Sequence, residues 1–311
     1  MDQLRHSYYE VVFENLYLKK GGGAFQDFFS EIMEKCHPND FQRVRPWGNA
    51  GDRKNDGYLH SERTLFQVYA PNEMIAKDAI TKINEDFHGA FPYWEMYFDK
   101  WIFVHNSRDG LGPDIVAKLN ELAIYYGSVT VGSWGFEELR QNVFTLNEAD
   151  LASLLGPAPS SRDILDVRYH DVQEVLSKIA RQEPPSHQDI RPVPPTKLKF
   201  NRLSADVQVL LTSGMQKADL VGQFFDEHFD PTYGDKIAAA FKKEYNKCRR
   251  LSMKPDTIFR KLQGFAGGSE RGTPTYEAAV LAVLAYLFEQ CDIFERSPEE
   301  VKHHDPSYQA S

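Results

Sequence analysis

Cysteines and long apolar runs are scarce in this sequence. Its three cysteines, Cys36, Cys248 and Cys291, lie far apart among 311 residues and form no Cys-x-x-Cys pair. The sequence therefore predicts neither a disulfide framework nor a zinc site. No stretch approaches the roughly 20 consecutive apolar residues of a membrane span, and the opening MDQLRHSYYE lacks the apolar core of a signal peptide. We expect a cytoplasmic protein with no membrane contact.

An excess of basic charge is also missing. The 36 Lys and Arg residues are outnumbered by 45 Asp and Glu, which gives a formal net charge of -9. This balance excludes a protein that coats nucleic acid through its overall field, so any contact with DNA must be local. One segment does concentrate basic residues, and these are the candidate DNA-binding residues: Arg43, Arg45, Arg53 and Lys54.

Two familiar catalytic motifs are absent. The glycine-rich residues 264–268 follow a predicted helix and lack the Lys-Ser/Thr of a P-loop, so we predict no nucleotide site there. No Gly-x-Ser-x-Gly motif supports a serine hydrolase on an α/β sheet.

Helical and strand-like segments alternate in the first half of the chain. Apolar residues at helical spacing predict helices over residues 24–36, 72–87 and 113–126. Strand-like runs flank a polar turn between residues 41 and 71, which indicates a hairpin, and further strands are predicted at 100–107 and 128–134. Two short helices, 135–146 and 148–155, complete a pattern typical of an α/β domain with a central sheet.

The pattern changes after residue 156. A helix is predicted over residues 164–181, the proline-rich EPPSHQDIRPVPP follows, and strand signals vanish beyond Lys197. One helix, residues 278–288, is apolar on nearly every side and must be buried. We therefore predict four parts: an α/β domain (1–156), a helix and proline-rich linker (157–197), an all-helical docking domain (198–296) and a polar tail (297–311).

The most informative polar residues lie around the predicted hairpin. They are Gly51-Asp52-Arg53-Lys54-Asn55-Asp56-Gly57-Tyr58, then Phe66-Gln67-Val68-Tyr69, preceded by the helix that begins at Phe25-Gln26. This order resembles the Mrr-like branch of the PD-(D/E)xK nucleases, over about residues 20–156. The resemblance implies a restriction-endonuclease-like mixed sheet flanked by helices.

The same resemblance implies a role for several residues. Asp56 matches the metal-binding aspartate and Gln67 the glutamine of the following strand, so both are expected at the metal and in catalysis. Cleavage of a phosphodiester suits a hard cation with oxygen ligands, here Mg²⁺ or Mn²⁺. Gln26, Asp52, Tyr69 and Lys82 are accessory candidates.

Two positions depart from the family pattern. Tyr69 stands where the family has a lysine, and Gln26 stands where its helix usually has a glutamate. A site that faces phosphate needs a cation. We expect Lys77, on the following helix, to replace the missing lysine, with Lys82 as the second choice.

Other interpretations of these residues stay open. Asn, Asp and Gly favour hairpin turns for local reasons, so the segment around Asp56 can be an ordinary turn. Tyr69 and Gln26 can mark a catalytically degenerate module that binds DNA or a protein partner. His105, at the end of a predicted strand, can face the site or be a polar strand terminus.

The helical region resembles the C-terminal domains of effectors in prokaryotic ABC-three-component defence systems. The similarity lies in phrases such as GQFFDEHFDPTYGDKIAAAF and PTYEAAVLAVLAYLFEQCDIF. It implies docking to an SMC-like ABC ATPase and a middle subunit, with Lamassu-like systems as the nearest relatives. Together the two resemblances imply a metal-dependent DNA endonuclease of antiphage or anti-plasmid defence. Self-association, and a helical bundle without a partner, are left open.

Overall fold

The computed structural model describes residues 1–44, 53–180, 196–267, 272–290 and 293–295. Its contacts divide the chain into an α/β unit, Phe13–Leu155, and a helical unit made of Met1–Val12 and Gly156–Ser311. The change of unit at residue 156 coincides with the predicted domain boundary. The first twelve residues, which we expected in the α/β domain, lie with the helical unit. The proline-rich residues 181–195 and the tail 297–311 lie outside the described residues.

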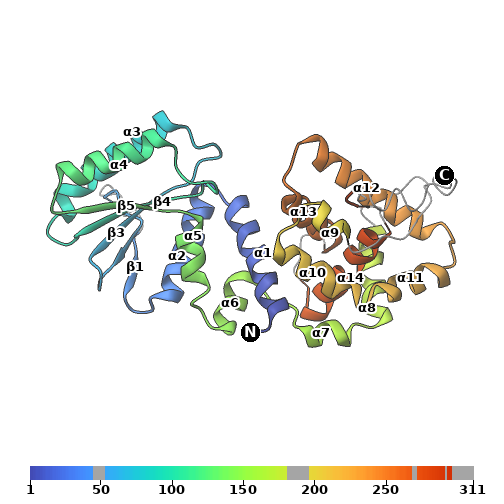
Figure 1. Cartoon of the computed structure of the whole chain (residues 1–311). Coiled ribbons are helices and arrows are strands. Elements are labelled where there is room, and N and C mark those ends of the chain that lie inside the picture. Colours follow the sequence, from blue (N-terminus) through green and yellow to red (C-terminus); the bar gives the residue numbers. More distant parts are fainter. Residues whose placement is uncertain (45–52, 181–195, 268–271, 291–292, 296–311) are drawn as a thin grey trace. The chain divides into compact units, whose positions relative to one another are not determined.

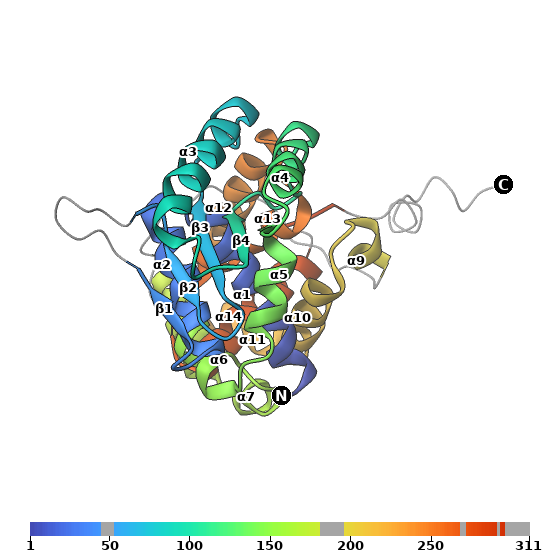
Figure 2. The same ribbon diagram turned by 90° about the vertical axis from the view of Figure 1, so that its left-hand side faces the viewer.

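The α/β unit contains a five-stranded mixed sheet in the order β1-β2-β3-β4-β5. Figure 2 labels β1, β2, β3 and β4 of this sheet. The strands are β1 (Phe41–Arg43), β2 (Gly57–Leu59), β3 (Thr64–Tyr69), β4 (Lys100–His105) and β5 (Thr130–Trp134). The first three strands are antiparallel, while β3, β4 and β5 are parallel. Parallel neighbours need crossover connections, which the helices between them supply. The α/β class with a sheet flanked by helices is confirmed.

Helices cover both faces of the sheet (Figure 1). One face is covered by α3 (Ala76–Trp94) and α4 (Pro113–Tyr125), the other by α2 (Gly22–Cys36) and α5 (Phe136–Val143), with α6 (Glu148–Leu155) beside α2. Side chains of a strand alternate between faces. Leu65 of β3 accordingly joins the core under α3 and α4, while the ring of Phe66 lies 5.3 Å from that of Phe29 on α2.

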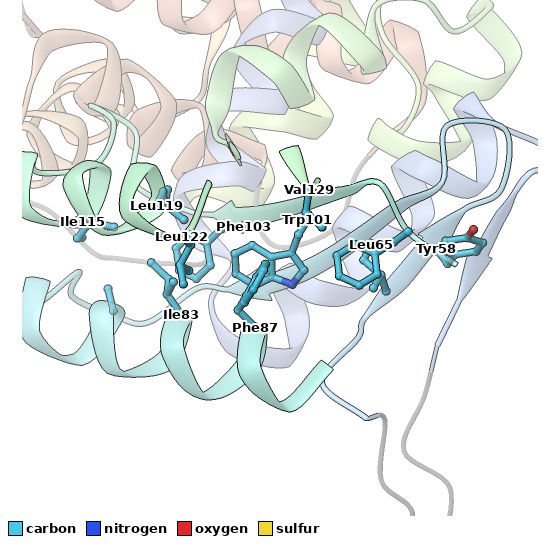
Figure 3. Packing of buried hydrophobic residues seen from close by; sticks show 12 residues of the cluster. Tyr58, Leu65, Ile83, Phe87, Trp101, Phe103, Ile115, Leu119, Leu122 and Val129 are labelled. Atoms are coloured by element: carbon cyan, nitrogen blue, oxygen red, sulfur yellow. The ribbon is translucent and has the colours of Figure 1, made fainter. Parts of the chain in front are cut away.

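Aromatic side chains dominate the core beneath α3 and α4. Figure 3 shows Phe87 of α3 against Trp101 of β4, whose ring centroids are 5.4 Å apart, with Leu119 and Leu122 of α4 nearby. Large rings bury much apolar surface each. This core fixes α3 against β3 and β4.

Two helix boundaries differ from the predicted ones. α3 begins at Ala76 rather than at residue 72, because Ile75 still has extended backbone angles, and it runs on to Trp94. α1 (Gln3–Lys19) was not predicted at all. Its buried residues, such as Tyr8, Tyr9 and Phe13, follow no single stripe, so the period that reveals an amphipathic helix is missing.

The helical unit is built around α14 (Pro274–Glu289), which is buried along nearly its whole length. It packs against five of the surrounding helices, α7, α8, α10, α11 and α13 (Figure 1). The bounds of these and the remaining helices are α7 (Ser161–Asp166), α8 (Tyr169–Ala180), α9 (Thr196–Phe200), α10 (Ala205–Met215), α11 (Ala218–Glu227), α12 (Tyr233–Arg250) and α13 (Pro255–Gly267). The predicted all-helical character of this region agrees with these elements.

A buried lysine fixes the end of α14. The ammonium of Lys197, on α9, donates to the carbonyl of Phe288 at 2.6 Å and to that of Ile293 at 2.8 Å. Carbonyls at the C-terminus of a helix lack partners within the helix and carry its negative pole, so a cation stabilises them. None of the helices in the described ranges is long and apolar enough to cross a bilayer.

Gly214 on α10 lies against the backbone of α14. A Cβ atom at this position would lie 2.3 Å from the Leu281 carbonyl oxygen, which cannot move independently of its helix. Gly214→Ala should therefore lower the free energy of unfolding by about 1–3 kcal/mol, the usual cost of overpacking. Urea denaturation of the full chain measures this change.

The matched control is Gly264→Ala on α13, where a Cβ would meet no atom within 4 Å. Alanine favours the helix there, and stability should rise by up to about 1 kcal/mol. Equal losses for the two variants would contradict the packing argument.

Candidate functional site

Asp56 lies one residue before β2, within the ladder of the sheet. Its N–H donates to the Phe66 carbonyl at 2.9 Å. The side-chain oxygen of Asn55 accepts from the Gly57 N–H at 2.9 Å, which forms the turn into the strand. Gly57 has no room for a side chain, because a Cβ would lie 2.3 Å from the Phe41 ring. Local geometry alone accounts for the Asn-Asp-Gly order, so the turn by itself does not identify a site.

The carboxylate of Asp56 ties three elements together. It is only 4% exposed, and its Oδ1 accepts from the Gln26 amide of α2 at 2.5 Å. Its Oδ2 accepts from the Val68 N–H of β3 at 2.7 Å. Gln26 can donate to a neighbouring carboxylate, whereas a glutamate at that position would repel it. The structure thus brings Gln26 and Asp56 into direct contact.

Gln67 lies opposite Asp56 across the β2-β3 ladder, since Gly57 pairs with Phe66. Its side chain is 4% exposed, and its Oε1 has no hydrogen-bond partner among the described residues. A buried acceptor without a donor costs free energy, and such groups in native proteins commonly mark a bound water, an ion or a functional role. Directly opposed residues have Cβ atoms about 5 Å apart.

The donor set therefore fits a hard divalent cation only in part. Asp56 and Gln67 offer oxygen ligands, but within the described ranges no group of three His, Cys, Asp or Glu residues could hold a metal ion. Mg²⁺ in nucleotide and polymerase sites is often held by one or two carboxylates together with substrate phosphates and water. The residues present match that arrangement and not a self-sufficient protein cage.

Tyr69 does not replace the missing lysine. It follows Gln67 at the spacing that places two residues on the same face of a strand. Its ring packs 5.9 Å from that of Phe103. Burial, and to a lesser degree the charge of Asp78, raises the pKa of the Tyr69 hydroxyl. The side chain is therefore neutral at pH 7 and adds no positive charge.

The two lysines considered on α3 lie in different surroundings. Lys77 is exposed, and helical geometry places it about 160° around the axis from the buried Ala79. Lys82 is half-buried, and its ammonium lies 2.9 Å from the carboxylate of Asp86, which is fully buried. The same carboxylate lies 3.2 Å from the ammonium of Lys54. The structure thus joins Lys82, rather than Lys77, to the segment that leads into Asp56.

Of the predicted DNA-binding residues, the structure describes Arg43, Arg53 and Lys54. Arg43 pairs with Asp27 on α2. Arg53 is exposed, with its guanidinium 4.5 Å from the ring centroid of Tyr93. Arg45, like the accessory candidate Asp52, lies outside the described residues.

A pocket of about 510 Å³ opens at the carboxyl ends of β4 and β5. His105 lines it and is 3% exposed, and its Nδ1 has no hydrogen-bond partner in the part of the chain that the structure describes. Burial lowers the pKa of His105 to about 4, against an opposing effect of Glu138. β3 separates this strand from β2, so His105 lies two strands away from Asp56. It does not join Asp56 and Gln67.

A comparison with protein families adds an independent result. Residues 170–295 match C-terminal domain 10 of the ABC-three component (ABC-3C) systems. The C-terminal region is similar to that domain. The match confirms the resemblance expected there and covers less than half of the chain, from α8 to the residues after α14. Searches of curated proteins and of solved structures found no match.

The depressed pKa of His105 makes stability depend on pH. Between about pH 6.5 and 4 the unfolded chain binds a proton at this residue while the folded chain does not, so stability falls as the pH falls through that range. The loss should approach about 3 kcal/mol at pH 4. His105→Gln should reduce this pH dependence in denaturation curves at pH 7 and pH 4.5. The exposed His88, replaced in the same way, should leave it unchanged; an identical pH dependence in both variants would refute the assignment.

Proposed function

We propose that the chain is an effector subunit of a prokaryotic ABC-three-component defence system directed against phage or plasmid DNA. In this proposal the helical unit docks to an SMC-like ABC ATPase and a middle subunit, and the α/β unit is a nuclease of the Mrr-like kind. The match of residues 170–295 supports membership of such a system. The observation that carries the nuclease part is the unsatisfied Oε1 of Gln67 opposite the buried carboxylate of Asp56.

The proposed reaction is hydrolysis of a DNA phosphodiester. A bound Mg²⁺ or Mn²⁺ would polarise the phosphate and make a bound water more acidic. Asp56 and Gln67 would hold that ion, and the Gln26 amide would keep the Asp56 carboxylate oriented through its 2.5 Å hydrogen bond. Water forms the new bond to phosphorus as the bond to the leaving sugar oxygen breaks. The water gives up a proton to solvent, and the leaving oxygen takes up a proton from solvent to become a hydroxyl group.

A second candidate function is a DNA-binding or protein-binding module without catalysis. It is favoured by the contacts of Asp56, because both carboxylate oxygens already accept hydrogen bonds from the protein. Tyr69 in place of the usual lysine favours it as well. Under this alternative, DNA binds and stays intact in Mg²⁺ and in Mn²⁺.

Asp56→Asn separates the two candidates. The substitution keeps the size of the side chain but removes its charge, and so it should lower the rate of plasmid cleavage by about 10²-fold or more, the scale of losing a metal ligand. The same variant should lose Mn²⁺ binding in the presence of a phosphorothioate DNA, measured by electron paramagnetic resonance.

Asp114→Asn is the matched control, because Asp114 is an exposed carboxylate in the first turn of α4. It should cleave DNA at the parental rate. Equal cleavage by Asp56→Asn and the parent would refute the site. DNA binding without cleavage by the parent, also with the ATPase complex present, would favour the binding module.

Docking can be tested independently of cleavage. Co-expression of the full chain with an ABC ATPase and a middle subunit encoded beside it should yield a complex that purifies together. The Asp56→Asn variant should join that complex as well as the parent does, because the substitution lies outside the helical unit. Failure of both proteins to co-purify would refute the proposed partners and leave the nuclease site to be judged by cleavage.

A further inference from the structure

The pocket of about 510 Å³ at the carboxyl ends of β4 and β5, here called the His105 pocket, takes no part in the proposed reaction. Sites for small molecules have volumes of about 300–1,000 Å³ and combine apolar walls with a few polar groups that fix the ligand. Leu111 and Val116 supply apolar surface here, while His105 and Ser133 supply polar groups. The pocket therefore has the size and the composition of a ligand site.

The imidazole ring of His105 makes no hydrogen bond with any residue that the structure describes, although His105 is only 3% exposed. Gly135 leaves room for the ring, because a Cβ at that position would lie 2.7 Å from its Cε1. Burial lowers the pKa of His105 to about 4, so the ring is neutral at pH 7 and has one donor and one acceptor nitrogen. A buried polar group without a partner costs free energy. A ligand with a polar edge would recover part of that free energy.

The charged side chains of the His105 pocket serve other contacts. They interact with groups of the chain itself: Arg108 with Glu14, Glu137 with Arg140, Glu138 with the Gly135 N–H, and Asp109 with a further neighbour. An ionic ligand would have to compete with these contacts. The polar groups that remain for a ligand are uncharged, namely the imidazole of His105 and the hydroxyl of Ser133, which makes no hydrogen bond within the described ranges. The pocket thus suits an uncharged ligand better than a phosphate.

A flat surface also belongs to the pocket. The guanidinium of Arg108 stacks on the ring of Phe136, 3.7 Å from its centroid, and both residues line the pocket. The side chain of Arg108 remains 36% exposed. Nucleobases stack on guanidinium planes as well as on aromatic rings. A flat ring with a polar edge therefore matches both the stacking surface and the imidazole.

We infer that the His105 pocket binds an uncharged nucleobase, which stacks on Arg108 and forms a hydrogen bond with His105. The inference deepens the proposed function and rests on it for the source of the base, which is an unpaired base of the DNA. Neighbouring strands are about 4.8 Å apart, so the pocket lies on the order of 10 Å from Asp56, two strands away. Successive phosphates of one DNA strand are about 3.4 Å apart along the duplex. The base would then belong to a nucleotide about three steps from the bond to be cut.

The test uses the full chain with Asp56→Asn as the parent, so that binding is measured without cleavage. Fluorescence anisotropy compares two short duplexes, one with a single unpaired base and one with an abasic unit in its place. The parent should bind the first about tenfold more tightly, which is within the range that base stacking supplies. Val116→Trp fills the pocket from α4, at a position that is 43% exposed, and should bring this ratio close to one.

Ile124→Trp is the matched control, because Ile124 lies about two turns further along α4, is 83% exposed and does not line the pocket. Its ratio should equal that of the parent. A ratio that survives Val116→Trp, in a protein whose melting curve shows that it is folded, would overturn the inference. Cleavage by the chain with Asp56 restored is measured separately, so the proposed function can stand while the pocket fails.

Free deoxynucleosides distinguish the two sources of a base. Saturation-transfer NMR with the four deoxynucleosides should show base-proton signals with the parent and with Ile124→Trp, and none with Val116→Trp. If the parent binds both duplexes equally or binds neither, DNA is overturned as the source, and signals that Val116→Trp removes would assign the pocket to a free nucleoside. Equal or absent duplex binding together with no such signals would overturn the pocket as a nucleobase site.

Discussion

A carboxylate withdrawn from water must be met by donors or cations, and the α/β unit is arranged around two such groups. Asp56 is met by an amide of α2 and a backbone N–H of β3. Asp86 is met by two lysines, one from α3 and one from the segment before β2. Removing a partner of a buried charge is far more costly than losing a surface ion pair. These contacts therefore fix how α2, α3 and β2 meet at one edge of the sheet.

The two carboxylates create different electrostatic surroundings at that edge. Asp56 lies next to a neutral amide, whereas Asp86 lies next to two ammonium groups. On the proposed function, a hard cation would suit the first, and DNA would bring its phosphates to that cation. The overall charge of -9 does not oppose this arrangement, because close contacts outweigh distant charges that salt screens.

Much of the α/β unit could be predicted, because its signals are local. The Phe-rich stripe of α2, the Asn-Asp-Gly turn and the apolar run of β4 each reveal their element from neighbouring residues. The sequence could not decide between Lys77 and Lys82, because the rotation of α3 about its axis determines which lysine approaches the segment before β2. That rotation is set by the packing of α3 on Trp101 and Phe103, which are distant in the sequence. Asp86 gave no signal either, because an acidic residue in an amphipathic helix normally lies in solvent. The uniformly apolar sequence of α14 revealed the helical unit. No signal in the sequence indicated that residues 1–12 belong to that unit.

Gln26 beside Asp56 has a consequence for the order in which ligands bind. With an amide in place of a second carboxylate, the protein offers a divalent ion one negative charge, and such a site holds the ion weakly on its own. A DNA phosphate would complete the coordination of the ion. By thermodynamic linkage, the ion would raise the affinity for DNA by the same factor by which DNA raises the affinity for the ion. On the proposed function, the resting subunit is then largely metal-free at ordinary magnesium concentrations. On the same function, its catalytic centre would be complete only while DNA is bound, so that free protein would not be poised for hydrolysis.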